Sequence, residues 1–387
     1  GSAGSIVSIQ DYRNTFDNNN CTVQTAGSQK INGGTAGGKV ILSTEGEGIT
    51  LVFIDSTIGW RSIQDNTFAS PSIIPTLISA TGGNAVVTNG DFKTHIFTGP
   101  GTFCVSAGGG GLNIADYIVV AGGGGGASPV SYGGGGGAGG FRISNSQGCI
   151  PAPTMSPLVA PDGITVAPGP YSIVVGAGGA VGNPVGSPGG VSTFSTITSA
   201  GGGGGAKCGA QGGSGGSGGG GSGGNPEPTA PNTKQGGVGN TPPVSPPQGN
   251  NGGAGNPGPQ APTGGEGGGG GGAGAVGSDA PGPNAAGPGG AGSFLADAFV
   301  GPTAPSYGTP GPVSSTRYFA GGGGGGTDSS GASRGSGGDG GGGQGAPSSA
   351  AGTTNTGGGG GGASHSGNPP SNGSAGGSGI VIIRYKF

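Results

Sequence analysis

Histidines and carboxylates are the residues in which catalysis or metal binding would first be sought. The chain holds two histidines, His95 and His365, and neither a nucleophile triad nor a metal cluster is readily assembled from so few. His95 alternates with apolar neighbours and is expected to be a strand residue. No pair of carboxylates stands out in a β context. The sequence therefore predicts a protein that is not an enzyme and that holds no cofactor and no metal.

Two further patterns could indicate ligand binding. The segment GGTAGGKV at 33–40 approaches a phosphate-binding loop, but Val40 stands where a hydroxyl must reach magnesium, and no helical pattern follows. The many GxGxxG matches carry no information in a chain with 110 glycines. Trp60 could stack on a sugar, although a role in a core or subunit interface is the preferred interpretation.

The cysteines show no spacing typical of zinc sites or of a disulfide framework. They are too few and too far apart, so inert thiols are expected. A bridge between Cys149 and Cys208 is the alternative. The four cysteines are Cys21, Cys104, Cys149 and Cys208.

Composition sets this chain apart from ordinary globular proteins, which contain about 7% Gly and about 25% charged residues. Of 387 residues, 110 are Gly and 32 are Pro, while 7% are charged. The net charge of −3 comes without a basic stripe, which argues against a nucleic-acid partner. No apolar run approaches the ~18 residues of a membrane span, so no membrane insertion is expected.

The first third of the sequence indicates β structure, because short β-rich runs are bounded by Gly and Asp. No helical period is visible. Residues 1–70 are expected to form a β module, and residues 71–120 a small β-sandwich-like module. In the first of these, the stretch from INGGTAGGKV at 31–40 to GWR at 59–61 resembles the β repeats of fibre shafts, which implies a shaft or docking element. The expected strands are 39–43, 49–54, 59–63, 84–88, 93–97, 101–105 and 116–120.

From residue 121 onward, glycine runs alternate with loops rich in Pro, Ser, Asn and Thr. This composition is typical of a flexible linker. Two features favour order instead. The runs are pure blocks of up to six glycines, often bracketed by alanine, and apolar strands are embedded among them at 141–144, 171–175, 191–198 and 379–385.

An ordered glycine block has few options, since glycine offers no side chain to bury and loses the most backbone entropy on folding. The extended threefold helix, with a rise of ~3.1 Å per residue, leaves every N–H and C=O pointing outward. Those groups must be paired, and helices packed side by side can pair them. Residues 121–387 are therefore expected to form an antiparallel polyglycine II bundle with connecting loops and short capping strands, without any α-helix longer than one turn.

Several segments resemble a known family. The sequences DYIVVAGGGGG at 116–126, YSIVVGAGG at 171–179 and GGSGIVIIRY at 376–385 resemble the glycine-rich domain of phage tail proteins, which is widespread in phages of marine cyanobacteria. KTHIFTGPGTFCV at 93–105 looks like the β segment that introduces it. The architecture is similar to tail-fibre tip adhesins of T-even-like phages, in which a polyglycine bundle carries host-contacting loops. Long Pro-rich insertions at 225–263 and 278–319 depart from the family's regular blocks.

The resemblance implies a virion protein of the tail or another surface appendage, assembled in the host cytoplasm. Its expected partners are other fibre or virion proteins, copies of itself, and a protein or polysaccharide receptor on the host cell. A structural virion component without receptor binding is the alternative. An ice-binding bundle is disfavoured by the irregular runs, and a depolymerase by the missing pair of acids.

The direction of successive runs predicts which loops lie far from the strands. If the apolar strands gather at one end, each run that leaves a strand must head away and the next must return. The loops expected at the far end are 128–132, 181–188, 207–211, 278–284, 327–336 and 364–374. Candidate receptor-contact residues in them are Tyr132, Lys207, Asp279, Asp328, Arg334, His365 and Asn368.

Overall fold

The computed structural model divides the chain into two compact units, residues 1–74 and 75–387, which are described separately. The prediction of an all-β chain with essentially no α-helix is confirmed. Within the described part, one α-helical turn, α1 (Asp297–Val300), and one 3-10 turn, η1 (Ala304–Ser306), are present. The structure describes residues 2–63, 77–108, 113–127, 132–148, 150–207, 210–224, 235–256, 265–282, 284–327, 333–364 and 371–387.

The first unit pairs a three-stranded antiparallel sheet with a β-hairpin. The sheet has the order β1-β4-β5, and the hairpin joins β2 to β3. Along β4, buried and half-buried residues alternate, as expected of a strand with one face on a core. The inward side chains of both sheets form that core, which is centred on Leu42, Ile49 and Leu51. The strands are β1 (Ile6–Gln10), β2 (Cys21–Gln24), β3 (Lys39–Leu42), β4 (Gly48–Asp55) and β5 (Gly59–Ser62).

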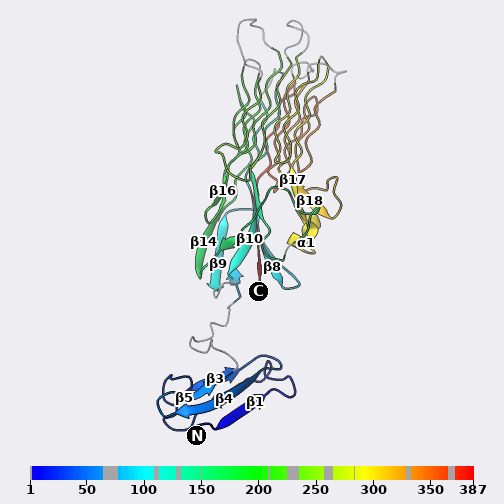
Figure 1. Cartoon of the computed structure of the whole chain (residues 1–387). Helices are drawn as coiled ribbons and strands as arrows, with labels where there is room; N and C mark the ends of the chain where they lie inside the picture. Colours follow the sequence, from blue (N-terminus) through cyan, green and yellow to red (C-terminus); the bar gives the residue numbers. More distant parts are fainter. Residues whose placement is uncertain are drawn as a thin grey trace. The chain divides into compact units, whose positions relative to one another are not determined.

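The second unit is built on a seven-stranded and a five-stranded sheet (Figure 1). The larger sheet has the order β12-β11-β10-β19-β8-β7, with β13 also paired to β10; the smaller has the order β16-β15-β14-β9-β6. Most pairs are antiparallel. The strands are β6 (Ser79–Thr81), β7 (Ala85–Asn89), β8 (Phe92–Phe97), β9 (Gly101–Ala107), β10 (Ile114–Val120), β11 (Phe141–Ser144), β12 (Val159–Ala160), β13 (Ile164–Thr165), β14 (Gly169–Val174), β15 (Ser192–Phe194), β16 (Ile197–Ser199) and β19 (Ile380–Lys386).

Both faces of the seven-stranded sheet are buried, which explains the unbroken apolar run of β19. Val381, Ile383 and Tyr385 face the five-stranded sheet, where they join Phe103 and its neighbours in one core. Ile380 and Ile382, which alternate with them, face a second core on the other side. The sequence-predicted strands at 141–144 and 171–175 lie in these sheets. The run 191–198 forms a hairpin instead of one strand, because Ser195 adopts a φ of 53°.

The sequence-based expectations for two further regions differ from the structure. Residues 293–319, treated as part of a Pro-rich insertion, contain β17 (Ser293–Ala296), α1, η1 and β18 (Thr316–Phe319). Their side chains, led by Phe299 and Phe319, cover the second face of the seven-stranded sheet. Residues 71–120 do not form a module of their own: β10 pairs with β19, and β9 with β14. The physical reason is that these strands bury their faces against partners supplied much later in the chain.

The glycine runs form a hydrogen-bonded bundle, here called the glycine bundle, which consists of the extended segments between residues 121 and 379 outside the strands. Figure 1 shows these segments leaving the sheets side by side. Their amides pair with other segments in a period of three. The amides of residues 133, 136 and 139 donate to the carbonyl groups of 363, 360 and 357; those of 134, 137 and 140 to 206, 203 and 200; and those of 135 and 138 to 268 and 271.

The same period recurs in another segment, where residues 267, 270 and 273 donate to residues 326, 323 and 320, while 268 and 271 donate to 221 and 218. A period of three is what the extended threefold helix predicts, since its residues point in three directions in turn. Neighbouring segments run both ways, so the expected purely antiparallel arrangement is wrong. Each segment has several neighbours that also touch one another, and three mutual neighbours cannot all be antiparallel.

Close approach in the glycine bundle requires glycine. A Cβ atom placed on Gly359 would overlap with the carbonyl oxygen of Gly136, and one on Gly136 would overlap with that of Gly124. Such overlaps occur throughout the bundle, and they involve backbone atoms that cannot turn away as a side chain could. The bundle therefore admits almost no side chain between its segments.

Buried polar side chains complete the junction between the sheets and the glycine bundle. Ser192 Oγ donates to Val120 O at 2.8 Å and accepts from Gly176 N at 2.9 Å. Ser199 Oγ donates to Val119 O at 2.8 Å. Gln248, which is 1% exposed, accepts from Ala200 N and donates to Pro242 O, both at 2.8 Å. These side chains thus form hydrogen bonds with backbone groups that are no longer paired in the sheets and not yet paired in the glycine bundle.

Candidate binding surface at the distal end of the glycine bundle

Many glycine segments have one end at the side of the bundle remote from the sheets (Figure 1). We call the described residues at this end the distal rim. They are held by hydrogen bonds between segments that lie far apart in the sequence. The distal rim comprises residues 127, 132, 182–185, 206–207, 223–224, 256, 266, 279–282, 284–285, 333–334, 364 and 371.

Backbone hydrogen bonds connect the turns of the distal rim. Lys207 N donates to Pro184 O at 2.8 Å, and Gly223 N donates to Tyr132 O at 2.9 Å. Ser333 N donates to Asn284 O at 2.9 Å. Because each glycine segment is fixed on several sides, the ends of the loops are fixed as well. The directions of the glycine runs predicted six loops at the distal end. The described residues that flank these six loops lie in the distal rim.

Tyr132 and Lys207 are half-buried residues of the distal rim. The Tyr132 ring lies against Gly224, whose φ of +63° turns the chain away there, and a Cβ at Gly224 would overlap with the ring. Lys207 follows Ala206, which pairs with Val185 in an isolated bridge. Both residues thus lie at the ends of glycine segments.

Asp279 and Arg334 are exposed. Asp279 Oδ1 accepts from Ala254 N at 2.6 Å, so this carboxylate also helps to hold two segments together. Arg334 follows Ser333, which bridges to Ala285. The three other candidates, Asp328, His365 and Asn368, lie outside the described residues.

The sequence did not single out the residues that connect the Pro-rich insertions to the distal rim. Gly224 N donates to Asn256 O at 3.1 Å, and Asn256 N donates to Glu266 O at 2.8 Å. Glu266 Oε1 accepts from Asn284 N at 2.8 Å. The insertion at 225–263 therefore begins at the same end as the other loops, and its described part, residues 235–256, runs within the bundle. The sequence feature that could have indicated this connection is Glu266, an isolated charged residue directly before the six-glycine block at 267–272.

The side chains of the distal rim are of mixed chemistry. The rim presents a tyrosine, cations at Lys207 and Arg334 and an anion at Asp279, without a dominant sign of charge. No group of three or more His, Cys, Asp or Glu residues that could hold a metal ion occurs among the described residues. Charged groups of both signs and a tyrosine are residue types that can form hydrogen bonds with a polar surface.

Titratable groups at the other end of the unit serve the core. His95, 1% exposed, makes hydrogen-bond contacts with Gly82 O at 2.6 Å through Nδ1 and with Tyr385 Oη at 3.0 Å through Nε2. Burial lowers the pKa of His95 and raises the pKa of Tyr385 to about 12. His95 lies within β8, as the alternation predicted. These groups are enclosed by the sheets and offer no open site.

Asp116 is fully buried and acts as an anchor for the turn after β11. Its carboxylate accepts hydrogen bonds from Ser144 Oγ, from Ser146 N and Oγ, and from Gln147 N, at 2.7 to 2.9 Å. Arg384 Nη1 donates to Gln147 O at 2.7 Å, and burial lowers the pKa of Arg384. Of the cysteines, Cys21 and Cys104 are free thiols, while Cys149 and Cys208, the pair considered for a bridge, lie outside the described residues.

Comparison with known proteins supports one assignment. A family model described as a glycine-rich domain matches residues 98–386. The chain belongs to the glycine-rich domain family. The match begins just before β9 and ends at Lys386, so the glycine-rich domain comprises most of both sheets of the second unit and the entire glycine bundle. A search of curated proteins gave no match.

None of the described helices is long and apolar enough to cross a membrane. The first unit lies outside the family match. The sequence segments used above to identify the glycine-rich domain at its two ends, 116–126 and 376–385, are adjacent in the structure, since β10 pairs with β19 from Ala115 to Val120.

Proposed function

We propose that this protein is a bacteriophage virion component, a tail-fibre adhesin that attaches to the host cell envelope through the loops of the distal rim. The proposal unites the resemblance to phage tail proteins with the family match to a glycine-rich domain. The partners it requires are other fibre or virion proteins and a protein or polysaccharide receptor.

The observation that carries the proposal is that the described flanks of many loops meet at one end of a hydrogen-bonded bundle. Binding residues in proteins are often placed on loops that a rigid scaffold positions. In the glycine bundle the scaffold has no side-chain core, and every segment is fixed by backbone hydrogen bonds to several neighbours. Loop sequences can therefore change without loss of the packing beneath them.

The composition of the loops favours recognition of a polar surface. Their ends present Tyr132, Lys207 and Arg334 beside backbone groups of the turns. Tyrosine and arginine are enriched where proteins bind other molecules, because each offers a large contact area together with hydrogen-bonding groups.

The test replaces the loops at 327–336 and 364–374 in phage particles that carry this protein. Gly/Ser segments of equal length are inserted, and adsorption to host cells is measured. Adsorption should be lost while the purified variant unfolds at the parent temperature. The matched control replaces residues 310–314, a turn at the sheet end. Normal adsorption of the loop variant would identify a structural virion component without receptor binding.

A further inference from the structure

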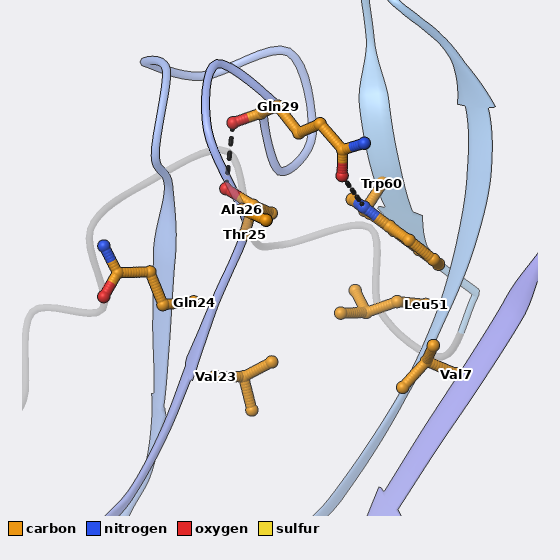
Figure 2. A pocket seen from close by; sticks show the side chains of 8 residues that line it. All are labelled: Val7, Val23, Gln24, Thr25, Ala26, Gln29, Leu51 and Trp60. Carbon is orange, nitrogen blue, oxygen red and sulfur yellow. Dashed lines mark hydrogen bonds between the residues drawn. The ribbon is translucent and has the colours of Figure 1, made fainter. Parts of the chain in front are cut away.

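The first unit contains a hollow between its two sheets, of about 200 Å³ (Figure 2). One wall comes from β2 and the turn that follows it, and the other from β1, β4 and β5. Figure 2 shows Val7, Leu51 and Trp60 on one side and Val23 on the other. The lining residues are Val7, Val23, Gln24, Thr25, Ala26, Gln29, Leu51 and Trp60.

The strand register shows that this space is left open at one end of the sandwich. Val7 pairs directly with Leu51, so both side chains stand on the inner face of the sheet. Leu51 is 3% exposed, whereas Val7 is 41% exposed. The two sheets thus close over Leu51 but not over Val7, and an inward-facing valine is left without a covering side chain.

The polar edge of the hollow is fixed in orientation. Trp60 Nε1 donates to Gln29 Oε1 at 2.9 Å. The indole N–H can only donate, so Gln29 must present its oxygen there, and its amide nitrogen remains a donor. Within the described part of the chain, no hydrogen-bond partner is found for that nitrogen.

The loop that carries Gln29 is itself held in place. Thr25 Oγ1 donates to Gln29 O at 2.8 Å, a bond drawn in Figure 2. Gly37 N donates to the same oxygen at 2.9 Å, and Trp60 N donates to Lys30 O at 2.8 Å. The indole and the amide are therefore pre-organised before any ligand arrives.

The lining defines the class of ligand. None of the eight residues carries a charge, and burial of an ion here would lack compensation. The volume falls below the roughly 300–1000 Å³ of pockets for drug-sized ligands, so one ring is the appropriate size. A purely apolar ring would leave the Gln29 amide nitrogen without a hydrogen-bond partner, which disfavours such a ligand.

We propose that this hollow binds a single neutral sugar ring, such as the terminal residue of a surface glycan. The C–H face of the ring packs on Val7, Val23 and the indole of Trp60. A hydroxyl group accepts from the Gln29 amide nitrogen, and Gln24, an exposed amide at the edge, bonds to another. This site lies in the first unit and does not depend on the distal rim.

Trp60 is the single tryptophan of the chain, so its fluorescence reports on this site alone. The full-length protein is titrated with glucose, galactose, mannose, N-acetylglucosamine and N-acetylgalactosamine, and the emission of Trp60 is followed. At least one sugar should produce a saturable change. No saturable change with any of the five would overturn the proposal.

Three variants locate the ligand. Val7→Phe fills the hollow and should abolish the response. Gln29→Leu removes the fixed donor and should raise the Kd about five- to tenfold, the effect of one hydrogen bond of about 1–1.4 kcal/mol. Gln24→Ala changes an exposed side chain that folding does not require, and it should raise the Kd about twofold or more.

Gln211→Leu, an exposed glutamine in the glycine bundle, is the matched control and should leave the titration unchanged. Thermal unfolding of each variant verifies that the first unit is folded. Should Val7→Phe fail to fold, the two glutamine variants decide the outcome. An undiminished response in both glutamine variants would place the sugar elsewhere and refute the site.

Discussion

The two ends of the second unit are stabilised in opposite ways. At the sheet end, large side chains such as Phe103, Phe141 and Phe319 are almost fully buried in two cores. In the glycine bundle, the buried segments consist mainly of glycine, and their backbone groups pair with several neighbours. The sheet end follows the usual rule that apolar volume drives folding. In the bundle, hydrogen bonds between buried backbone segments take the place of buried apolar side chains, because glycine permits the segments to approach closely.

This contrast implies different tolerance to substitution. A core of side chains accepts a residue of similar volume at small cost, because neighbours can adjust. A glycine bundle has no similar residue to offer, since alanine is the next smallest and its Cβ already overlaps with backbone atoms.

The largest effect is expected for Gly359→Ala. The added Cβ would overlap with Gly136 O and push two segments apart, which breaks two or more buried backbone bonds. Two broken bonds leave four groups unpaired at about 1–3 kcal/mol each, so the loss should be at least about 4 kcal/mol in the free energy of unfolding. Chemical denaturation of the full-length chain measures it.

Gly99→Ala is the matched control, because a Cβ at Gly99 meets nothing within 4 Å. Its stability should stay within about 0.5 kcal/mol of the parent, as for ordinary surface changes. Equal stability of the two variants would contradict the close packing of the glycine bundle.

At the sheet end, stability should depend on the volume of the buried side chain. Phe319→Ala leaves a cavity and should cost about 3–5 kcal/mol, whereas Phe319→Leu, which conserves more of the volume, should cost clearly less. Phe319 is fully buried against the seven-stranded sheet. If Leu and Ala are equally damaging, the distinction between the two ends fails.

A smaller effect is expected for Asp116→Asn. The amide keeps one acceptor oxygen and turns an NH₂ group toward a backbone N–H, so at least one hydrogen bond to a charged group is lost. The loss should be about 1.5–3 kcal/mol. Asp279→Asn, at an exposed carboxylate, is the comparison and should cost less than about 1 kcal/mol; the midpoints of urea unfolding give both values.

The smallest effect concerns pH. Burial, together with the charge of nearby Lys93, lowers the pKa of His95 from its ordinary value of 6.5. As the pH falls, His95 of the unfolded chain therefore binds a proton at a higher pH than His95 of the folded chain. The free energy of unfolding should thus fall as pH drops below about 6.5. Thermal unfolding at pH 7.5 and 5.0 measures the fall. His95→Gln should reduce this pH dependence, and an unchanged dependence would assign it to other groups.

The position of the candidate site was predicted in part from the directions of successive glycine runs. The turns next to Tyr132, Lys207, Asp279 and Arg334 lie at the distal end, because glycine segments must leave and return to the sheets. The connection through Asn256, Glu266 and Asn284 was not predicted, since it depends on which segments are neighbours. Receptor contact at these residues is a prediction that the loop replacements test.

The sequence by itself determined most local conformations outside residues 191–198 and 293–319. Short runs rich in apolar and β-branched residues produced the strands, and pure glycine blocks excluded both α-helix and an ordinary core. Only the tertiary structure decided the neighbours. It placed β19 beside β10, covered the sheet with residues 293–319, and mixed parallel with antiparallel glycine segments. The physical reason is that glycine blocks are chemically identical, so nothing in one block specifies its partner. The lengths of the loops and the side-chain packing of the strands at the sheet end select one arrangement among many.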